Sequence, residues 1–185
     1  MTRIPMQISR FRADDVTAVA ALYGRAVRIG ARQAYPRKAL LAWARPRLSM
    51  RFFRNRMLPT WTFVATVPGG GATRQRFPGA GQGGSLGHGG EVVLGFAEIM
   101  QDGHVRMLFT DPAATRSGIA SRLLVHALDH ARSHGITSFT TDASRLSRPV
   151  FARAGFRPMG HRLRAVAGAR LLTTRMVLRP GRHAV

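Results

Sequence analysis

The sequence has no cysteine, a single lysine and only eight acidic residues among its 185 positions. The lack of cysteine excludes disulfides, thiolate metal sites and a cysteine nucleophile. No apolar run approaches the roughly 20 residues that span a bilayer, and residues 1–11 lack the apolar core of a signal peptide. These absences favour a cytoplasmic protein without a membrane partner. A chain of 185 residues can bury a hydrophobic core, so we predict one domain over residues 1–185.

Arginine dominates the charge. The chain has 29 Lys and Arg residues, of which Lys38 is the only lysine, and a formal net charge of +21. Such a surface attracts polyanions, and the arginine-rich run at residues 45–56 is where nucleic acid would bind. The arginines are dispersed and are not interleaved with aromatic residues, which favours a compositional origin over nucleic-acid binding. In both cases the surface attracts anionic ligands and repels polycationic ones.

Residues 107–124 form the most informative segment. Met107–Asp111 reads as an apolar strand followed by a turn, and residues 112–118 are mostly small. The helix that follows carries an apolar stripe at three- and four-residue spacing, made of Ile119, Ala120, Leu123, Leu124, Ala127, Leu128 and Ala131, with Gly135 as its C-cap. A helix start presents unpaired N–H groups, and small residues let a phosphate approach them. Arg116 and Arg122 add positive charge, so the segment predicts an anion site that suits a pyrophosphate.

The rest of the chain alternates between strand and helix patterns. Strands are expected over residues 5–12, 61–67, 91–100, 105–111, 137–142, 157–164 and 170–178. Helices are expected over 14–30, 36–44, 118–134 and 146–154, while residues 46–58 form a short helix or an ordered loop. This order predicts an α/β (α+β) fold, with a mixed, mostly antiparallel sheet of about six or seven strands and helices on both faces.

Residues 68–90 interrupt this pattern. They are dominated by Gly, with Pro, Ser, Gln and Arg, and have too few apolar side chains to offset the entropy of ordering. We therefore expect an enlarged, flexible hairpin loop, and we expect the deletion of residues 70–89 to leave the fold intact. A turn is expected at Gly168.

Two motifs resemble the GNAT N-acetyltransferase superfamily. Residues 115–120 are similar to its acetyl-coenzyme A signature, Q/R-x-x-G-x-G/A, with Thr115 in place of the usual Gln or Arg. That departure is typical of the bacterial YafP-like subgroup. Thr141–Ser144 and Arg148–Phe156 resemble the family segment DAS…KPFF-x-x-x-GF. The resemblance also takes in Tyr35–Trp43 and Leu178–Pro180, and it covers nearly the whole chain except residues 68–91.

The resemblance implies a GNAT fold and acetyl-CoA as cosubstrate. Backbone groups of one strand would pair with the pantetheine arm, which would enter a splay between that strand and the next, near residues 139–142. The signature loop and the helix start would hold the pyrophosphate. The implied cofactor-binding residues are Leu108, Phe109, Thr110, Thr115, Arg116, Ser117, Gly118, Ile119, Ala120, Ser121, Ser144 and Phe151. Ser144 lies where many relatives have an Asn that contacts the cofactor, but it could equally cap the helix that follows.

The catalytic residues are a separate expectation. A general base would be Glu98 or His104, with Asp142 ranked below them because capping or positioning Ser144 suits it better. Phe151 lies where many relatives carry a Tyr that protonates the departing thiolate, and Phe has no proton to give. Water would then supply the proton, or the thiolate would leave unprotonated, which its pKa of roughly 8.5 permits at modest cost.

A cluster of histidines and a set of aromatic residues can each be interpreted as structural or as functional. His126, His130 and His134 recur every four residues on one helix, but no metal-binding pattern of carboxylates accompanies them, so we expect a solvated face, shared with Asp129 and Arg132, and no metal. Tyr23, Trp43, Phe52 and Phe53 line an acceptor pocket or belong to the core. We predict an N-acetyltransferase, monomeric or homodimeric, that acetylates a primary amine of a small molecule or, less readily, of a protein. The alternative is a basic nucleic-acid-associated protein with a vestigial or regulatory acetyl-CoA site.

Overall fold

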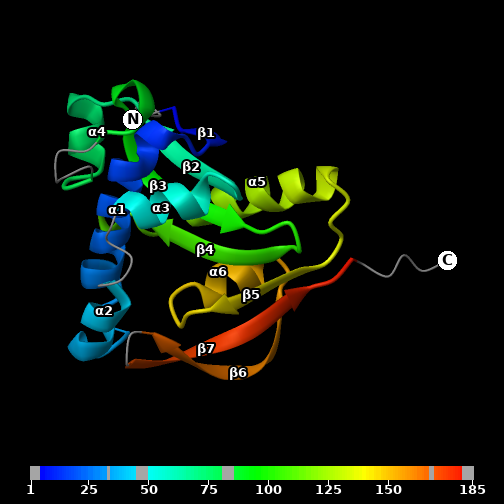
Figure 1. The fold of residues 1–185 in the computed structure, drawn as a ribbon. Helices are drawn as coiled ribbons and strands as arrows, with labels where there is room; N and C mark the ends of the chain where they lie inside the picture. The colour runs from blue at the N-terminus through cyan, green and yellow to red at the C-terminus, as the bar shows by residue number, and fades with distance from the viewer. Residues whose placement is uncertain (1–4, 33, 45–49, 81–85, 167–168, 181–185) are drawn as a thin grey trace.

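The computed structural model describes residues 5–32, 34–44, 50–80, 86–166 and 169–180. Within these ranges, seven strands form one sheet in the order β1-β2-β3-β4-β5-β7-β6 (Figure 1). The strands are β1 (Gln7–Arg10), β2 (Trp61–Val67), β3 (Val92–Ile99), β4 (His104–Thr110), β5 (Phe139–Ala143), β6 (Arg157–Val166) and β7 (Ala169–Leu178). β4 and β5 pair parallel, and the other neighbours pair antiparallel. The predicted mixed, mostly antiparallel sheet is confirmed.

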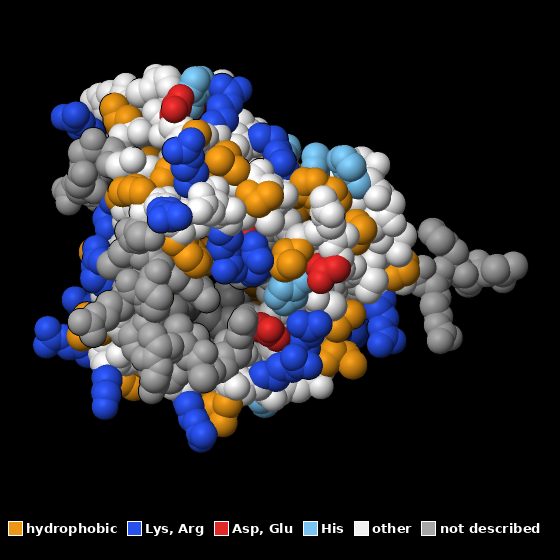
Figure 2. Space-filling view, in the orientation of Figure 1, with side chains coloured by type: hydrophobic (Ala, Val, Ile, Leu, Met, Phe, Trp, Pro, Cys, Tyr) orange, Lys and Arg blue, Asp and Glu red, His pale blue; other side chains and the backbone are white. Residues whose placement is uncertain are grey.

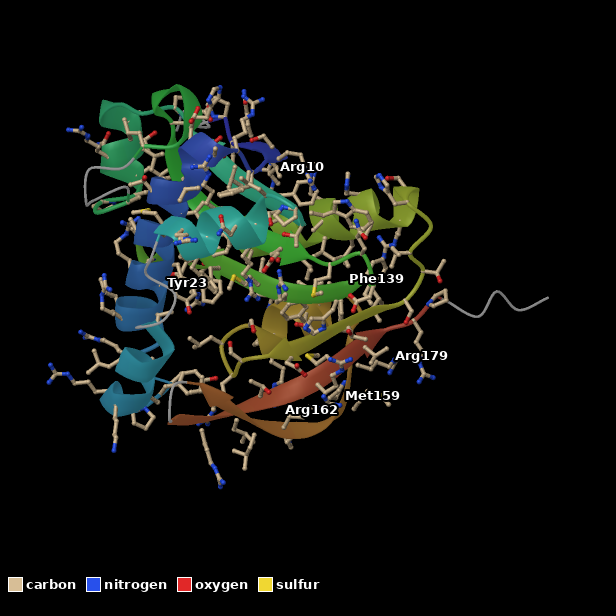
Figure 3. The ribbon with its side chains drawn as sticks, viewed as in Figure 1. Arg10, Tyr23, Phe139, Met159, Arg162 and Arg179 are labelled. Atoms are coloured by element: carbon tan, nitrogen blue, oxygen red, sulfur yellow. The ribbon has the colours of Figure 1, made fainter. Side chains whose placement is uncertain are left out.

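Helices cover both faces of the sheet. On one face lie α1 (Val16–Arg25), α2 (Arg37–Ala44) and α3 (Met50–Met57), and on the other lie α5 (Ile119–Ser133) and α6 (Arg148–Arg153) (Figure 1). Each layer has its own apolar core, one beneath α5 and α6 and one beneath the N-terminal helices. Tyr23 projects from α1 into the second core, and Phe139 belongs to the first (Figure 3).

The apolar stripe of α5 explains how this helix docks. Six of its seven predicted members are buried, namely Ile119, Leu123, Leu124, Ala127, Leu128 and Ala131, and Ala120 is half-buried. The helix lies against β2, β3 and β4. Gly95 of β3 permits the close approach, because a Cβ there would meet the Leu123 Cδ1 atom at 2.9 Å. This packing fixes the start of α5 beside the end of β4.

The sheet splits in the middle. Between β4 and β5, pairing extends only over His104 with Thr140 and Val105 with Thr141. Beyond these pairs the two strands diverge toward α1 and α2 (Figure 1). The predicted splay is therefore present, and the second half of β4 has backbone groups that the neighbouring strand does not pair.

The segment at residues 68–90 differs from the expected loop. It contains a short helix, α4 (Gly71–Arg76), and Phe77 is buried against the core beneath α5, with 8 % of its surface exposed. The end of the segment is held as well, because the Asp15 carboxylate accepts the backbone N–H of His88 at 2.9 Å. The expectation of a segment without regular structure is wrong at α4, since one aromatic side chain anchors it. Residues 81–85 lie outside the described residues, as does the turn expected at Gly168.

Candidate active site

A cavity of about 930 Å³ lies where the end of β4 meets the N-terminus of α5. The structure brings together on its wall ten of the expected cofactor-binding residues: Leu108, Phe109, Thr110, Thr115, Arg116, Gly118, Ile119, Ala120, Ser121 and Ser144. The other two lie elsewhere. Ser117 is exposed, and Phe151 is buried beside the second cavity. Their contact with a cofactor stays a prediction, but the strand, loop and helix start converge as expected.

The loop before α5 has the geometry of an anion site. Arg116 and Gly118 have φ values of 60° and 83°, both in the left-handed region. The Ser117 hydroxyl donates to the Ala114 carbonyl at 2.5 Å, which closes the turn. A Cβ at Gly118 would meet no atom within 4 Å, so the space above it is open. Left-handed turns that point successive N–H groups at one spot form anion-binding concavities, and a helix start adds its partial positive charge.

The opposite wall of the larger cavity was not predicted. Helix α1 passes into a π-helical turn, η2 (Ala26–Gly30), and Ala26, Val27 and Gly30 line the cavity. Such turns occur often at functional sites. The sequence pattern continued as one helix to residue 30, and a shift from α to π hydrogen bonding leaves no signal in apolar periodicity.

A buried ion pair joins the two walls. The Asp111 carboxylate accepts from Arg25 at 2.6 Å (Nη2) and 3.0 Å (Nε), and its other oxygen accepts the Ala113 N–H at 3.0 Å. Asp111 is 1 % exposed, and the Arg25 side chain is 14 % exposed. Arg25 ends α1 just before the π-helical turn, and Asp111 follows β4. The pair therefore holds both sides of the cavity at a set separation.

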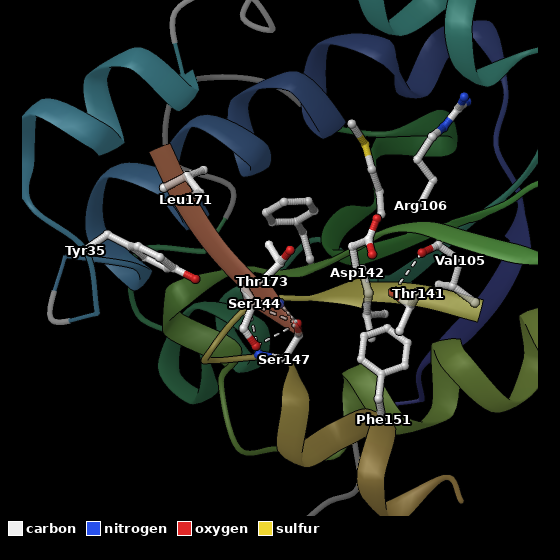
Figure 4. Close-up of a pocket in the computed structure, with 13 residues that line it drawn as sticks. Tyr35, Val105, Arg106, Thr141, Asp142, Ser144, Ser147, Phe151, Leu171 and Thr173 are labelled. Atoms are coloured by element: carbon white, nitrogen blue, oxygen red, sulfur yellow. Dashed lines mark hydrogen bonds between the residues drawn. The ribbon is translucent and has the colours of Figure 1, made fainter. Parts of the chain in front are cut away.

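The second cavity, about 100 Å³, fills the splay between β4 and β5 (Figure 4). It shares Leu108, Phe109, Ser144 and Ser147 with the larger cavity, so the two adjoin along β4 and the start of α6. Ser144 and Ser147 bond reciprocally, since the Ser147 N–H donates to the Ser144 hydroxyl at 3.1 Å and the Ser144 N–H donates to the Ser147 hydroxyl at 3.0 Å. Ser144 thus caps the turn into α6 and also lies at the junction of the cavities, so its two predicted roles are compatible.

Glu98 and His104 line neither cavity. Glu98 is 0 % exposed and accepts from Arg106 Nε at 2.9 Å and from Thr60 at 3.1 Å, with Arg56 Nε at 3.5 Å. These partners occupy both oxygens of the Glu98 carboxylate, and neither cavity reaches it. Glu98 as general base stays a prediction that this geometry does not favour. His104 is half-buried, and its Nδ1 lies 2.9 Å from the Thr140 hydroxyl, at the paired end of the splay.

Asp142 and Tyr35 come into the second cavity instead. Asp142, on β5, is 11 % exposed and lies 3.6 Å from the Arg175 guanidinium. Tyr35 is buried, and its hydroxyl accepts the Arg145 N–H at 3.2 Å. Phe151 lines the same cavity, and its side chain has no acidic proton. Tyr35 brings a phenolic O–H group to this cavity, although the sequence analysis named Tyr35 only as part of the family resemblance.

The remaining clusters have structural surroundings. Tyr23 and Phe53 are fully buried, and Tyr23 packs edge-on against both Phe53 and Phe109, so these aromatics belong to the core rather than to a pocket wall. Phe52 is half-buried beside Phe53, and the Trp43 side chain lies outside the described residues.

The three histidines of α5 do not form the purely solvated face that was expected. The rings of His126 and His130 lie against Phe63, and those of His130 and His134 lie against Trp61. Burial, reinforced by His134, Arg10 and His126, lowers the pKa of His130. No group of three potential ligand side chains able to hold a metal ion occurs within the described ranges.

Comparison with known proteins agrees with this geometry. The family model of the acetyltransferase (GNAT) domain matches residues 71–178, more than half of the chain. The chain belongs to the GNAT acetyltransferase family. It is 25% identical over 151 residues to the uncharacterized N-acetyltransferase YafP of Escherichia coli K12, a match that covers 82% of this chain and 81% of YafP.

Solved structures show the same fold. A GCN5-related N-acetyltransferase from Rhodopseudomonas palustris superposes with a TM-score of 0.78 at 20% identity, over 97% of this chain and 99% of its own. The PaiA N-acetyltransferase from Thermoplasma acidophilum, solved in complex with coenzyme A, superposes with a TM-score of 0.66 at 13% identity, over 95% and 99%. This GNAT protein is thus an N-acetyltransferase. No helix in the described part of the chain is long and apolar enough to cross a membrane.

Proposed function

We propose that this GNAT enzyme moves the acetyl group of acetyl-CoA to the primary amine of a small molecule, by direct attack within one ternary complex. The observation that carries the proposal is the pair of adjoining cavities. The larger one offers an anion site at the start of α5, and the smaller one meets it at Leu108, Phe109 and Ser144. The PaiA relative, solved with coenzyme A, supports the same ligand here.

The residues of this chain would divide the work along the two cavities. The left-handed loop and the N–H groups at the start of α5 would bind the pyrophosphate. Backbone groups in the second half of β4, which β5 does not pair, would bind the pantetheine arm and polarise the thioester carbonyl. The cosubstrate supplies an activated acetyl group, and the protein supplies orientation and a dry site. A small acceptor is favoured over a protein because the second cavity is only about 100 Å³.

The test is acetyl-CoA binding by a matched pair of glycine variants. Gly118 and Gly135 lie at opposite ends of α5 and both have φ of 83°, and a Cβ added to either would meet no atom within 4 Å. Gly118→Glu and Gly135→Glu therefore incur the same backbone strain, but only the first places a carboxylate in the anion site. Acetyl-CoA at about 100 times its Kd stabilises a binding protein by roughly 2.7 kcal/mol, which raises Tm by about 5–10 °C in a chain of this size.

We expect the shift in the wild type and in Gly135→Glu and its loss in Gly118→Glu, while ADP and phosphate at equal concentration produce smaller shifts. Turnover is then measured as release of the coenzyme A thiol, to which a chain without cysteine contributes no background. A wild-type shift in Gly118→Glu, or no shift in the wild type, would overturn the assignment of the site.

The alternative of a nucleic-acid-associated protein gains no support from the described residues. In the arginine-rich run, Arg56 turns inward to Glu98, and Arg45 and Arg47 lie outside the described residues.

A further inference from the structure

The second cavity limits the size of the acceptor. Its volume is about 100 Å³. In the proposed complex the end of the pantetheine arm also reaches this cavity along β4, so the space that is left for the acceptor is smaller still. A long polyamine or a peptide would have to extend beyond it, whereas a small amine would fill it next to the junction with the larger cavity.

The wall of this cavity carries one acidic side chain. The chain has eight Asp and Glu residues, all within the described ranges, and Asp142 is the one that lines the cavity. Figure 2 shows how sparse acidic side chains are against the many basic ones on one face of the molecule. The Asp142 carboxylate is the anionic group on this wall, so an ammonium group that enters a site with limited solvent would pair with it, in competition with Arg175 at 3.6 Å.

Among the described residues, Arg106 is the basic side chain on the same wall. β3 and β4 pair Glu98 with Met107 and Ile99 with Val105, so Arg106 is the extra residue of a β-bulge. Bulges re-aim side chains, and Figure 4 shows Arg106 and Asp142 rising from neighbouring strands on the side of the N-terminal helices. Glu98 binds Arg106 from behind the cavity wall, and it also binds Arg56, so Arg106 is the member of this trio that the cavity reaches.

We infer that the acceptor is a compact zwitterion, a small amino acid, whose amino group is held by Asp142 and whose carboxylate is held by Arg106. The inference rests on the proposed function and names its substrate class. Asp142 is then a catalytic residue: its carboxylate takes one proton from the acceptor ammonium. The neutral amine attacks the thioester carbon, the C–N bond forms and the C–S bond breaks. The second amine proton leaves with the thiolate as the coenzyme A thiol, and Asp142 returns its proton to solvent.

The first experiment compares acceptors of equal length. The probes are 3-aminopropanoate, propylamine and 1,3-diaminopropane, extended to glycine, alanine and 4-aminobutanoate, with thiol release as the readout. We expect kcat/KM for the best amino acid to exceed that of its matched alkylamine at least 10-fold, with the diamine lowest. Equal or better use of the diamine overturns the inference. The inference is also overturned if no amino acid is acetylated although acetyl-CoA raises the Tm of the protein. Because the rise in Tm shows that acetyl-CoA binds, this result would contradict the acceptor class and not the proposed function.

The second experiment uses two variants and a control. Asp142→Asn is expected to lower kcat/KM for all amines about 100-fold or more, as loss of a general base does. Acetyl-CoA should still raise the Tm of this variant. Its activity should rise with pH without the plateau of the wild type, because only an acceptor amine that is already neutral in solution can react. Arg106→Lys, which keeps a charge for Glu98, should raise KM for amino acids about 10-fold and leave KM for propylamine unchanged.

Asp129→Asn is the matched control, since Asp129 lies exposed on α5 and pairs with Arg132, away from both cavities. It should behave as the wild type in every assay. An unchanged pH profile in Asp142→Asn, or an Arg106→Lys defect of equal size for amino acids and propylamine, would show that these residues only support the fold.

Discussion

The ion pair of Asp111 with Arg25 offers the sharpest test of how the site is held. The change is Asp111→Asn, which keeps the size of the side chain and removes its charge. In the wild type one Asp111 oxygen receives two N–H groups of Arg25 and the other receives the Ala113 N–H. The amide can keep the bond from Ala113, but the Arg25 guanidinium loses the charge of Asp111 at 14 % exposure.

The expected loss follows from that burial. Removing one partner of a buried ion pair costs about 3–5 kcal/mol, because the remaining charge is not solvated. At about 2–4 °C per kcal/mol in chains of this length, Tm should fall by roughly 6–20 °C. The control is Asp129→Asn, the same chemical change in the exposed pair with Arg132, where side-chain exposures are 49% and 61%. Exposed pairs contribute about 0.2–1 kcal/mol, so Tm should fall by less than about 4 °C.

The assay is thermal and urea unfolding of both variants, followed by acetyl-CoA titration of each. Because the pair joins β4 to the π-helical turn, Asp111→Asn should also weaken acetyl-CoA binding, while Asp129→Asn should not. Adding Arg25→Met to Asp111→Asn should cost little more, or restore part of the stability, since the uncompensated charge is then gone. Equal losses in the two single variants would refute the view that this pair holds the cavity.

Three further predictions concern other parts of the fold. Phe77→Ala should lower the free energy of unfolding, measured in urea, by about 3–5 kcal/mol. The control is Arg76→Ala at an exposed position, and a smaller loss of free energy in Phe77→Ala than in this control would show that residues 68–90 are a dispensable loop. Ser147→Ala removes the hydroxyl that receives the Ser144 N–H and should cost about 0.5–2 kcal/mol while raising the Kd for acetyl-CoA, and an unchanged Kd would separate Ser144 from the cofactor. The folded-state pKa of His130 is lowered, so the unfolded chain binds its proton first, and stability should fall as pH drops below about 6.5. Melts at pH 7 and pH 5 should show a smaller fall in His130→Gln, and an equal fall would assign the pH dependence to other groups.

The segment to which we assign cofactor binding was predictable because its signals are local. A strand, a run of small residues and the stripe of α5 lie within residues 107–131, and each is read from neighbours in sequence. The positive φ at Gly118 also has a local cause, since glycine adopts it without strain. Sequence patterns failed to predict local structure where a single contact between residues distant in sequence determines it. One buried ring, Phe77, orders a segment whose composition indicates disorder.

The general base is the part of the site that sequence predicts least well. The acidic side chains look alike in the sequence, and their roles depend on the residues that contact them from distant parts of the chain. Glu98 on β3 resembles a candidate base until Arg56, 42 residues earlier, and Thr60 are seen to bind it. Asp111 receives Arg25 from 86 residues away, and Asp15 receives His88 from 73 residues away. In a chain with eight acids and 29 basic residues, the fold uses these three carboxylates as ties between elements. Our proposal therefore assigns the proton transfer to an acid that lines a cavity, and Asp142 meets that condition only once β5 is placed beside the open end of β4.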